Sequence, residues 1–386
     1  MKHTYYLYLL LLGTLFACQA ENNSEDIDTI ISEVKESHAP DKRVALFDVQ
    51  WEDGQLSGET NLPAAHDELV RKLISKNISF TDSIQLLPDP KLGTKHLALV
   101  TNSVANIRSA PKHSAELATQ ALMGTPLNVL KSQGSWYLVQ TPDKYLSWVD
   151  AAAIVLVDQN TMDEWLQKEK IVVTEMISTV YENDNFEQIV SDITAGNVLE
   201  LVGYENGNYQ VILPDQRKGI IQGNHAVTYE VWKNSRSTND TNLIQTARKM
   251  MGAPYLWGGT SPKGVDCSGF TKTIYFLNGM IIPRDASQQI KEGELIDNDK
   301  NWDNLQVGDL LFFGVPATET SKERVVHVGM WIGDGKFIHS RGRVRISSFD
   351  PADEHFDAPE LARYLRTKRI RNQPSENILT VDQVLQ

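Results

Sequence analysis

The chain has 386 residues, of which 41% are hydrophobic and 23% are charged, and this composition is typical of folded globular proteins. It is too long for one ordinary domain, so we expect two or three. Its 50 acidic and 37 basic residues give a formal net charge of −13, which argues against nucleic acid and anionic membrane surfaces as partners.

The first residues predict an export signal that ends at a cysteine. An apolar run over 5–17 is too short to span a bilayer and has the length of a signal-peptide core. Residues 15–18 read Leu-Phe-Ala-Cys and resemble a bacterial lipobox, in which the cysteine is acylated. We expect a lipoprotein signal peptide over 1–17 and a lipidated Cys18 that anchors the protein to a membrane of the bacterial cell envelope. An ordinary signal peptide with an incidental cysteine is the alternative.

The next part of the chain predicts a tether and a small folded segment. Residues 18–42 are polar and acidic, and we expect them to form the tether. Residues 43–95 predict two strands that join at Asp53-Gly54, a helix over 64–75 and a further strand that ends near Pro88. We assign this segment no chemistry and expect it to dock on the domain that comes next in the chain.

Two runs of short strands separated by Gly and Pro turns predict two small β-barrels, over 96–158 and 171–235. The first contains N-x-R-x-x-P, then G-x-x-L-x-V-L, W-Y-L-V and Y-x-x-W-V, and this order resembles a bacterial SH3-like domain. The second repeats the pattern more divergently, which suggests tandem modules joined by a connecting helix over 159–170. Plain structural packing is the alternative for both, and we favour it for the second.

The stretch 264–270, Gly-Val-Asp-Cys-Ser-Gly-Phe, predicts a nucleophile at the start of a helix. The apolar residues that follow Cys267 recur at helical spacing: Phe270, Ile274 and Leu277. Asp266 is suited to cap this helix, so Cys267 falls in its first turn. Free N–H groups and the helix dipole favour a thiolate there and can receive an oxyanion. A small buried cysteine that packs as a hydrophobe is the alternative.

Two histidines downstream are candidates for the base that a thiol nucleophile needs. His327 and His339 lie in apolar strands on either side of a Gly-Asp-Gly turn at 333–335. If the loop has three residues centred on Asp334, residues whose numbers sum to 668 lie opposite each other in the two strands, so His339 lies opposite Gly329. Both histidines would then share one face, at the diagonal spacing of about 7–8 Å. A two-residue turn would put them on opposite faces. Either histidine alone could be a satisfied core residue.

Four motifs in order carry a family resemblance. Tyr-Leu-Trp-Gly-Gly at 255–259, Asp-Cys-Ser-Gly-Phe at 266–270, His-Val-Gly-Met at 327–330 and Phe-Ile-His-Ser at 337–340 together resemble the NlpC-type cell-wall cysteine peptidases. The likeness covers roughly the last third of the chain, and Gly-Asp-Leu at 308–310 also fits it.

The resemblance implies a papain-like α+β catalytic domain, here 236–372, followed by a C-terminal tail at 373–386. It implies Cys267 as nucleophile, His327 as general base, His339 as its orienting partner and Tyr255 near the oxyanion. It implies no metal and no cofactor. Neither an HExxH sequence nor a zinc-type Cys/His cluster is present in the sequence.

The fusion to SH3-like modules resembles a narrower subgroup, the γ-D-glutamyl-L-diamino acid endopeptidases, which act on released murein peptides with a free N-terminal L-alanine. Such a substrate requires a cation for the glutamate α-carboxylate and an anion for the ammonium group. Arg284 and Asp285 offer both, although a surface ion pair between them is as good an interpretation. By resemblance, the first barrel closes this end of the groove. The further substrate-binding candidates are Asp266, Ser268, Glu116 and Tyr145.

We therefore expect a monomeric cysteine endopeptidase that hydrolyses the γ-D-glutamyl-L-diamino acid bond of murein peptides. A non-catalytic peptidoglycan-binding lipoprotein is one alternative, which the intact Cys/His/His set argues against. An amidase or acyltransferase on the same scaffold is another.

Overall fold

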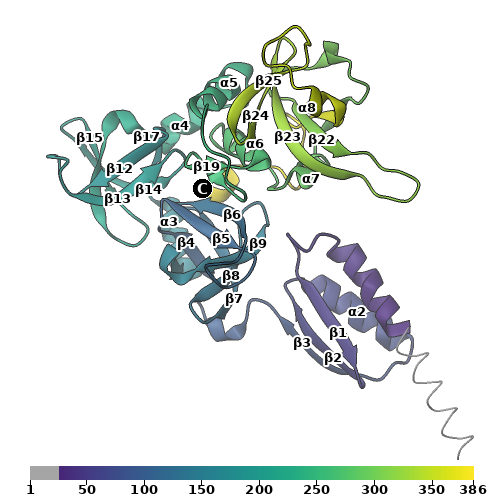
Figure 1. Cartoon of the computed structure of the whole chain (residues 1–386). Coiled ribbons are helices and arrows are strands. Elements are labelled where there is room, and N and C mark those ends of the chain that lie inside the picture. Colours follow the sequence, from purple (N-terminus) through teal and green to yellow (C-terminus); the bar gives the residue numbers. More distant parts are fainter. Residues whose placement is uncertain (1–25) are drawn as a thin grey trace, which may run out of the picture. The chain divides into compact units, whose positions relative to one another are not determined.

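The computed structural model describes residues 26–386, which fall into two compact units that divide between Gly93 and Thr94 (Figure 1). The predicted signal peptide and the lipidation site Cys18 lie outside the described residues. Within residues 26–386, no helix is both long and apolar enough to cross a membrane.

The N-terminal unit is a three-stranded sheet with two helices. The sheet joins β1 (Phe47–Glu52), β2 (Gln55–Thr60) and β3 (Thr81–Leu86) in that order, with β1 antiparallel and β3 parallel to β2. The helices are α2 (Pro63–Ser75) and a segment at 26–38. The predicted strands around Asp53-Gly54 and the helix over 64–75 are therefore present.

The prediction of a tether over 18–42 is wrong for residues 26–38. They are helical, and Ile27, Ile30, Ile31 and Val34 are buried in one core with β1, β2 and α2. These four residues follow the i, i+3, i+4, i+7 spacing of one helix face. The acidic residues between them occupy the solvent side, so composition alone concealed an amphipathic helix.

The second unit begins with two seven-stranded antiparallel sheets. The first contains β4 (Leu97–Val100), β5 (Val104–Arg108), β6 (Leu117–Leu122), β7 (Pro126–Gln133), β8 (Trp136–Gln140), β9 (Leu146–Asp150) and β10 (Ile154–Val157). The second contains β11 (Lys170–Val173), β12 (Ile177–Tyr181), β13 (Ile189–Thr194), β14 (Val198–Glu205), β15 (Asn208–Ile212), β16 (Lys218–Gln222) and β17 (Ala226–Thr228). The helix α3 (Gln159–Gln167) connects them, and α4 (Tyr229–Ser235) follows the second.

The two seven-stranded sheets have the same strand order. Numbered from the first strand of each, both run seventh, first, fourth, fifth, sixth, second, third. The repeat that the sequence predicts is therefore present as a repeat of topology, although the two segments differ in their residues.

The remainder of the unit is α+β. Its six-stranded antiparallel sheet has the order β21-β26-β22-β23-β24-β25. The strands are β21 (Glu294–Asp297), β22 (Leu310–Val315), β23 (Arg324–Gly333), β24 (Lys336–Arg341), β25 (Arg343–Ser348) and β26 (Tyr364–Arg369). The helices are α5 (Asp240–Lys249), α6 (Cys267–Phe276), α7 (Ala286–Gln289) and α8 (Ala358–Ala362).

Helix α6 packs its apolar face on this sheet. Phe270 and Ile274 are fully buried in one cluster with Val328 and Met330 of β23 and Ile338 of β24. The predicted stripe after Cys267 is confirmed. Its burial fixes the start of α6 beside β23 and β24, where His327 and His339 lie.

The C-terminal segment 373–386 is a folded part of this unit rather than a tail. Its strand β27 (Leu379–Thr380) pairs with β20 (Met280–Ile281), and its helix α9 (Asp382–Leu385) follows. Val381 and Leu385 are buried in a cluster that includes Trp165 of α3 and Trp232 of α4. The segment therefore packs the α+β part of the unit against helices α3 and α4, which flank the second seven-stranded sheet.

The burial of the helix at 26–38 can be tested by hydrogen exchange of the whole chain. Replacing buried Ile30 with Ala removes core contacts worth about 2–5 kcal/mol, so amides of β1 and β2 should exchange faster. Lys35→Ala, on the exposed face of the same helix, should leave them within about 0.5 kcal/mol. Equal behaviour of the two variants would show that residues 26–38 are a tether after all.

Candidate active site

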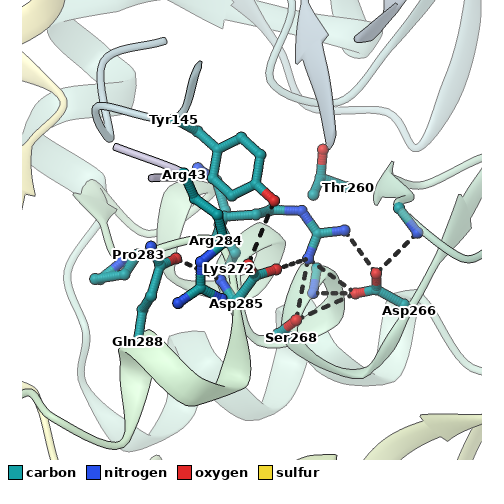
Figure 2. Close-up of polar contacts among 12 residues, drawn as sticks. Arg43, Tyr145, Thr260, Asp266, Ser268, Lys272, Pro283, Arg284, Asp285 and Gln288 are labelled. Atoms are coloured by element: carbon teal, nitrogen blue, oxygen red, sulfur yellow. Dashed lines mark hydrogen bonds and ion pairs between the residues drawn. The ribbon is translucent and has the colours of Figure 1, made fainter. Parts of the chain in front are cut away.

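Asp266 holds the start of α6 in place and connects it with two other segments of the chain. Its Oδ1 accepts the Gly269 N–H at 2.7 Å, which is the predicted helix cap. Its Oδ2 accepts the Gly258 N–H at 2.9 Å. Arg284 donates to both oxygens, at 3.1 Å and 2.6 Å, and Ser268 Oγ lies 3.3 Å from Oδ1 (Figure 2). The backbone around the nucleophile is therefore fixed from several sides.

Two glycines permit this close packing. A Cβ on Gly269 would lie 1.9 Å from the carbonyl oxygen of Gly259. Gly258 has a φ of +79°, and a Cβ there would lie 2.2 Å from the Leu117 carbonyl oxygen of the first seven-stranded sheet. A side chain at position 269 would push the 255–259 segment away from α6, and one at position 258 would push it away from the first seven-stranded sheet.

Arg284 does not occupy the position that the sequence suggested. Its side chain is only 1% exposed, and its guanidinium is bonded to Asp266 and, at 3.0 Å, to Ser268 Oγ. Burial alone would lower its pKa, but Asp266 outweighs this and raises the pKa, so Arg284 is always charged. The expected surface ion pair with Asp285 is a 3.9 Å contact. Arg284 therefore positions Asp266 and Ser268, and its role in binding a substrate carboxylate stays a prediction.

Cys267 is the first residue of α6 and is buried, with 8% of its surface exposed. Burial, followed by the charge of Asp266, raises the pKa of its thiol to about 12, although N–H groups of Val328 and Ser268 donate to the sulfur and lower it. Burial therefore opposes the thiolate that the helix start was expected to favour. The contact with Val328 places Cys267 beside the residue that follows His327.

The two histidines pair as predicted, with Nε2 of His327 at 2.7 Å from Nδ1 of His339. The turn, however, has two residues, Asp334 and Gly335, rather than three. A register shift between Trp331 and Gly333 inserts one extra residue into β23. Farther from the turn the strands therefore pair as predicted, with residue numbers that sum to 668, such as Met330 with Ile338. The bulge puts both histidines on one face.

A chain of hydrogen bonds beyond His339 fixes the tautomers of both rings. Nε2 of His339 lies 3.0 Å from Ser347 Oγ, which lies 3.0 Å from Oδ2 of Asp357. The Asp357 carboxylate can only accept, so Ser347 donates to it and accepts the His339 Nε2–H. His339 Nδ1 then accepts the His327 Nε2–H, which leaves the Nδ1 lone pair of His327 free to take a proton. Arg345 Nε is more distant from His339, at 3.4 Å.

Both histidines are held neutral. Burial, followed by Arg363, Arg341 and Arg345, lowers the pKa of His327 to about 3. Burial, followed by His327 and Arg345, lowers the pKa of His339 to about 2. The resting pair is therefore a neutral thiol and a neutral imidazole. Nucleophilic attack requires that the proton leaves the sulfur for His327 as the new bond forms.

Buried Glu360 completes the surroundings of His327, at 3.9 Å from its Nε2. Glu360, His327 and His339 lie close enough to form a three-ligand cluster. However, Glu360 is already paired with Arg341 at 2.8 Å and Arg363 at 2.5 Å, and the two imidazoles share a hydrogen bond. The geometry is that of a charged hydrogen-bond network rather than a metal site.

The residues behind the histidines were not predicted from the sequence. Ser347, Arg345 and Arg341 lie on β24 and β25, and Asp357 and Glu360 lie at α8. The alternation Arg-Val-Arg-Ile-Ser over 343–347 is a usable strand signal. With it, His339 could have been placed opposite Arg345, which is the observed register.

The first seven-stranded sheet brings three residues to the catalytic segment: Gln120 of β6, and Glu116 and Tyr145, which directly precede β6 and β9. Glu116 accepts the Trp257 Nε1–H at 2.6 Å, the Tyr145 hydroxyl lies 3.3 Å from Oδ2 of Asp285, and Gln120 accepts the Thr260 N–H at 2.9 Å (Figure 2 shows the Tyr145 contact).

Tyr255, two residues before Trp257, is close enough to Cys267 for the two groups to be coupled. Burial, then Cys267 and Asp266, raise the pKa of Tyr255, so its hydroxyl stays a donor. Glu116, Tyr145, Tyr255 and Asp285 are therefore gathered around the nucleophile segment.

The neutral histidines predict acid sensitivity. Between pH 6.5 and about 3 the unfolded chain binds protons at His327 and His339 that the folded chain does not bind. Stability should therefore fall as the pH falls below 6.5, by up to about 1.4 kcal/mol per pH unit for each histidine. Urea titrations from pH 7.5 to 5.0 should show a shallower slope for His327→Gln/His339→Gln. His113→Gln, at an exposed position, should keep the wild-type slope.

The position of Arg284 predicts a structural defect. Arg284→Met leaves Asp266 buried without its partner, which should lower the free energy of unfolding by about 3–5 kcal/mol in urea titrations. Arg248→Met, at an exposed arginine of α5, is the matched control. A stable Arg284→Met protein whose only defect is a raised KM would show instead that Arg284 binds substrate.

Comparisons with known proteins agree with this geometry. Residues 252–361 match the NlpC/P60 family, and residues 107–154 match the bacterial dipeptidyl-peptidase Sh3 domain. The chain is 33% identical over 233 residues to the gamma-D-glutamyl-L-lysine dipeptidyl-peptidase of Bacillus cereus, a match that covers 58% of this chain and 67% of that protein. It is 32% identical over 232 residues to the protein of the same name from Bacillus subtilis, with 58% and 72% covered.

The crystal structure of an NlpC/P60 family protein from Bacillus cereus superposes on the chain with a TM-score of 0.61 and 26% identity, covering 71% of this chain and 99% of that one. The buried cysteine at a helix start and the paired histidines thus lie in a fold that the solved protein shares. The chain belongs to the NlpC/P60 family and is a cysteine peptidase with an adjoining bacterial SH3 domain.

Proposed function

We propose that the chain hydrolyses the γ-D-glutamyl-L-diamino acid bond of murein peptides released from the cell wall with a free N-terminal L-alanine, as part of wall turnover or recycling. The names of the two Bacillus relatives support the bond and its dipeptide product. The observation that carries the proposal is the hydrogen-bond chain that ends at His327, because it leaves one basic nitrogen on the residue that precedes Val328, whose N–H contacts the sulfur of Cys267.

The reaction divides into two acyl transfers. His327 takes the Cys267 proton as the sulfur attacks the γ-carbonyl of D-glutamate. N–H groups at the start of α6, with the Tyr255 hydroxyl, are suited to stabilise the oxyanion. His327 then gives its proton to the leaving amine, and a thioester remains on Cys267. Water, deprotonated by His327, attacks the thioester and releases L-Ala-D-Glu.

The acyl side of the substrate is assigned to the end of the site near the first seven-stranded sheet. Glu116 and Asp285 bring two carboxylates there, with the Tyr145 hydroxyl. Carboxylates at this point suit a free ammonium, and a wall of protein behind them would exclude a chain that continues into glycan. This arrangement favours released peptides over intact peptidoglycan.

We also propose how the remaining parts serve this activity. The identical strand order supports a second SH3-like barrel over 171–235, and the helix-start cysteine facing an antiparallel sheet supports a papain-like core. The proposal includes a lipid on Cys18, a location at a membrane of the bacterial envelope and a monomeric protein.

The substrate can be tested with three materials: L-Ala-γ-D-Glu-meso-diaminopimelate, its N-acetylated form and intact sacculi. Mass spectrometry should detect L-Ala-D-Glu from the free peptide alone, and Cys267→Ala should abolish it. Glu116→Gln should raise KM for the free peptide about tenfold, since one charge-assisted contact is lost. Glu187→Gln, at an exposed glutamate between β12 and β13, should leave KM unchanged. Cleavage of sacculi would refute the closed groove, and no Cys267-dependent product would refute the proposed reaction.

A further inference from the structure

Three arginines share the face of β24 and β25 that carries His339. In the antiparallel register His339 lies opposite Arg345, and Arg341 lies opposite Arg343, so these odd-numbered residues point to one side of the sheet. Together with Ser347, Glu354 and Asp357 they line a groove with a volume of about 1020 Å³. Three guanidinium groups within five residues are a local reversal of charge in a chain whose net charge is −13.

Two of these arginines are committed to protein carboxylates. Arg341 contacts Glu360 at 2.8 Å and Asp357 at 3.7 Å, and Arg345 contacts Asp357 at 3.0 Å. Arg343 differs from them. It is exposed, and within residues 26–386 its guanidinium has no hydrogen bond or ion pair.

The acidic residues of the groove do not neutralise Arg343. Asp357 also accepts from Ser347, and Glu354 is 85% exposed and lies 3.7 Å from His355. Arg343 is thus the cation of the groove that is available to a ligand, and a guanidinium binds a carboxylate with two parallel hydrogen bonds.

The groove lies on the leaving-group side of the reaction. The proton that His327 takes from Cys267 must pass to the amine that departs, so the leaving amino acid lies on the histidine side of the sulfur. Arg341 contacts Glu360, which lies 3.9 Å from Nε2 of His327, and Arg345 Nε lies 3.4 Å from His339, which places the groove on that side. The acyl half occupies the opposite end, near Tyr145 and Asp285.

We propose that Arg343 binds the side-chain carboxylate of the leaving diamino acid, and that the chain therefore prefers meso-diaminopimelate to L-lysine at this position. The side chain of meso-diaminopimelate ends in a carboxylate beside its amine, whereas that of L-lysine ends in an ammonium alone, which a cationic groove repels. This inference rests on the proposed function and refines its substrate. The Bacillus relatives are named for L-lysine, so the preference would set this chain apart from those names.

The test compares the full chain on three peptides that share L-Ala-γ-D-Glu and end in meso-diaminopimelate, its side-chain amide or L-lysine. Wild type should cleave the first with a kcat/KM about tenfold above the other two, since one charge-assisted pair is at stake. Arg343→Ala should remove this advantage and leave the other two peptides within about twofold, and Arg343→Lys should retain part of it. Arg71→Ala, at an exposed arginine of α2, controls for the loss of one charge.

Equilibrium binding separates this inference from the proposed function. Calorimetry on Cys267→Ala, with and without Arg343→Ala, reports affinity without turnover. Tighter binding of the diaminopimelate peptide than of its amide, lost with Arg343→Ala, supports the site even if no peptide is cleaved. Equal binding of the two, an equal effect of Arg343→Ala on all three peptides, or a wild-type preference for L-lysine would overturn it. Absence of Cys267-dependent cleavage would instead refute the proposed function alone.

Discussion

The buried ion pair between Asp266 and Arg284 is the constraint on which the active centre depends. Asp266 is used twice, because it caps the helix that presents Cys267 and also holds the Gly258 N–H of the preceding loop. Without Arg284 such a carboxylate would be costly to bury, because its charge would be unpaired. The same charge also opposes ionisation of the Cys267 thiol. The pair therefore fixes the position of the sulfur while leaving the cysteine protonated at rest.

Because the cysteine is protonated at rest, the histidines must remove its proton before or during the attack. Their orientation is set from behind, by the Asp357 carboxylate acting through Ser347 and His339, so the basic nitrogen of His327 is defined before substrate arrives. Burial, followed by the surrounding arginines, lowers the pKa of both imidazoles and keeps them neutral, hence able to accept a proton. Arg343 belongs to the same group of arginines, and it lines the groove in which the leaving group would lie. The arginines of β24 and β25 thus lie beside the histidines, and Arg343 among them is the residue that we propose for recognition of the leaving group.

Local patterns predicted the parts of the site that depend on neighbouring residues. Residue spacing alone predicted three features: the apolar stripe after Cys267, the Asp266 cap, and the shared face of His327 and His339. The position of Arg284 was not, because its burial depends on residues 18 positions away in sequence. The hairpin turn was predicted at the wrong length, and a bulge compensated for it. The helix at 26–38 was not predicted, because the acidic composition of the segment favours a tether, whereas its apolar residues recur at helical spacing.

The central claim is that Cys267 carries the γ-D-glutamyl group during the reaction. Rapid quenching of the full chain with L-Ala-γ-D-Glu-meso-diaminopimelate, followed by peptide mass spectrometry, tests it directly. The predicted result is an adduct with the mass of the L-Ala-γ-D-Glu acyl group on the peptide that contains Cys267, released as dipeptide and absent from Cys267→Ala. An adduct on any other residue, or turnover that survives in Cys267→Ala, would contradict it.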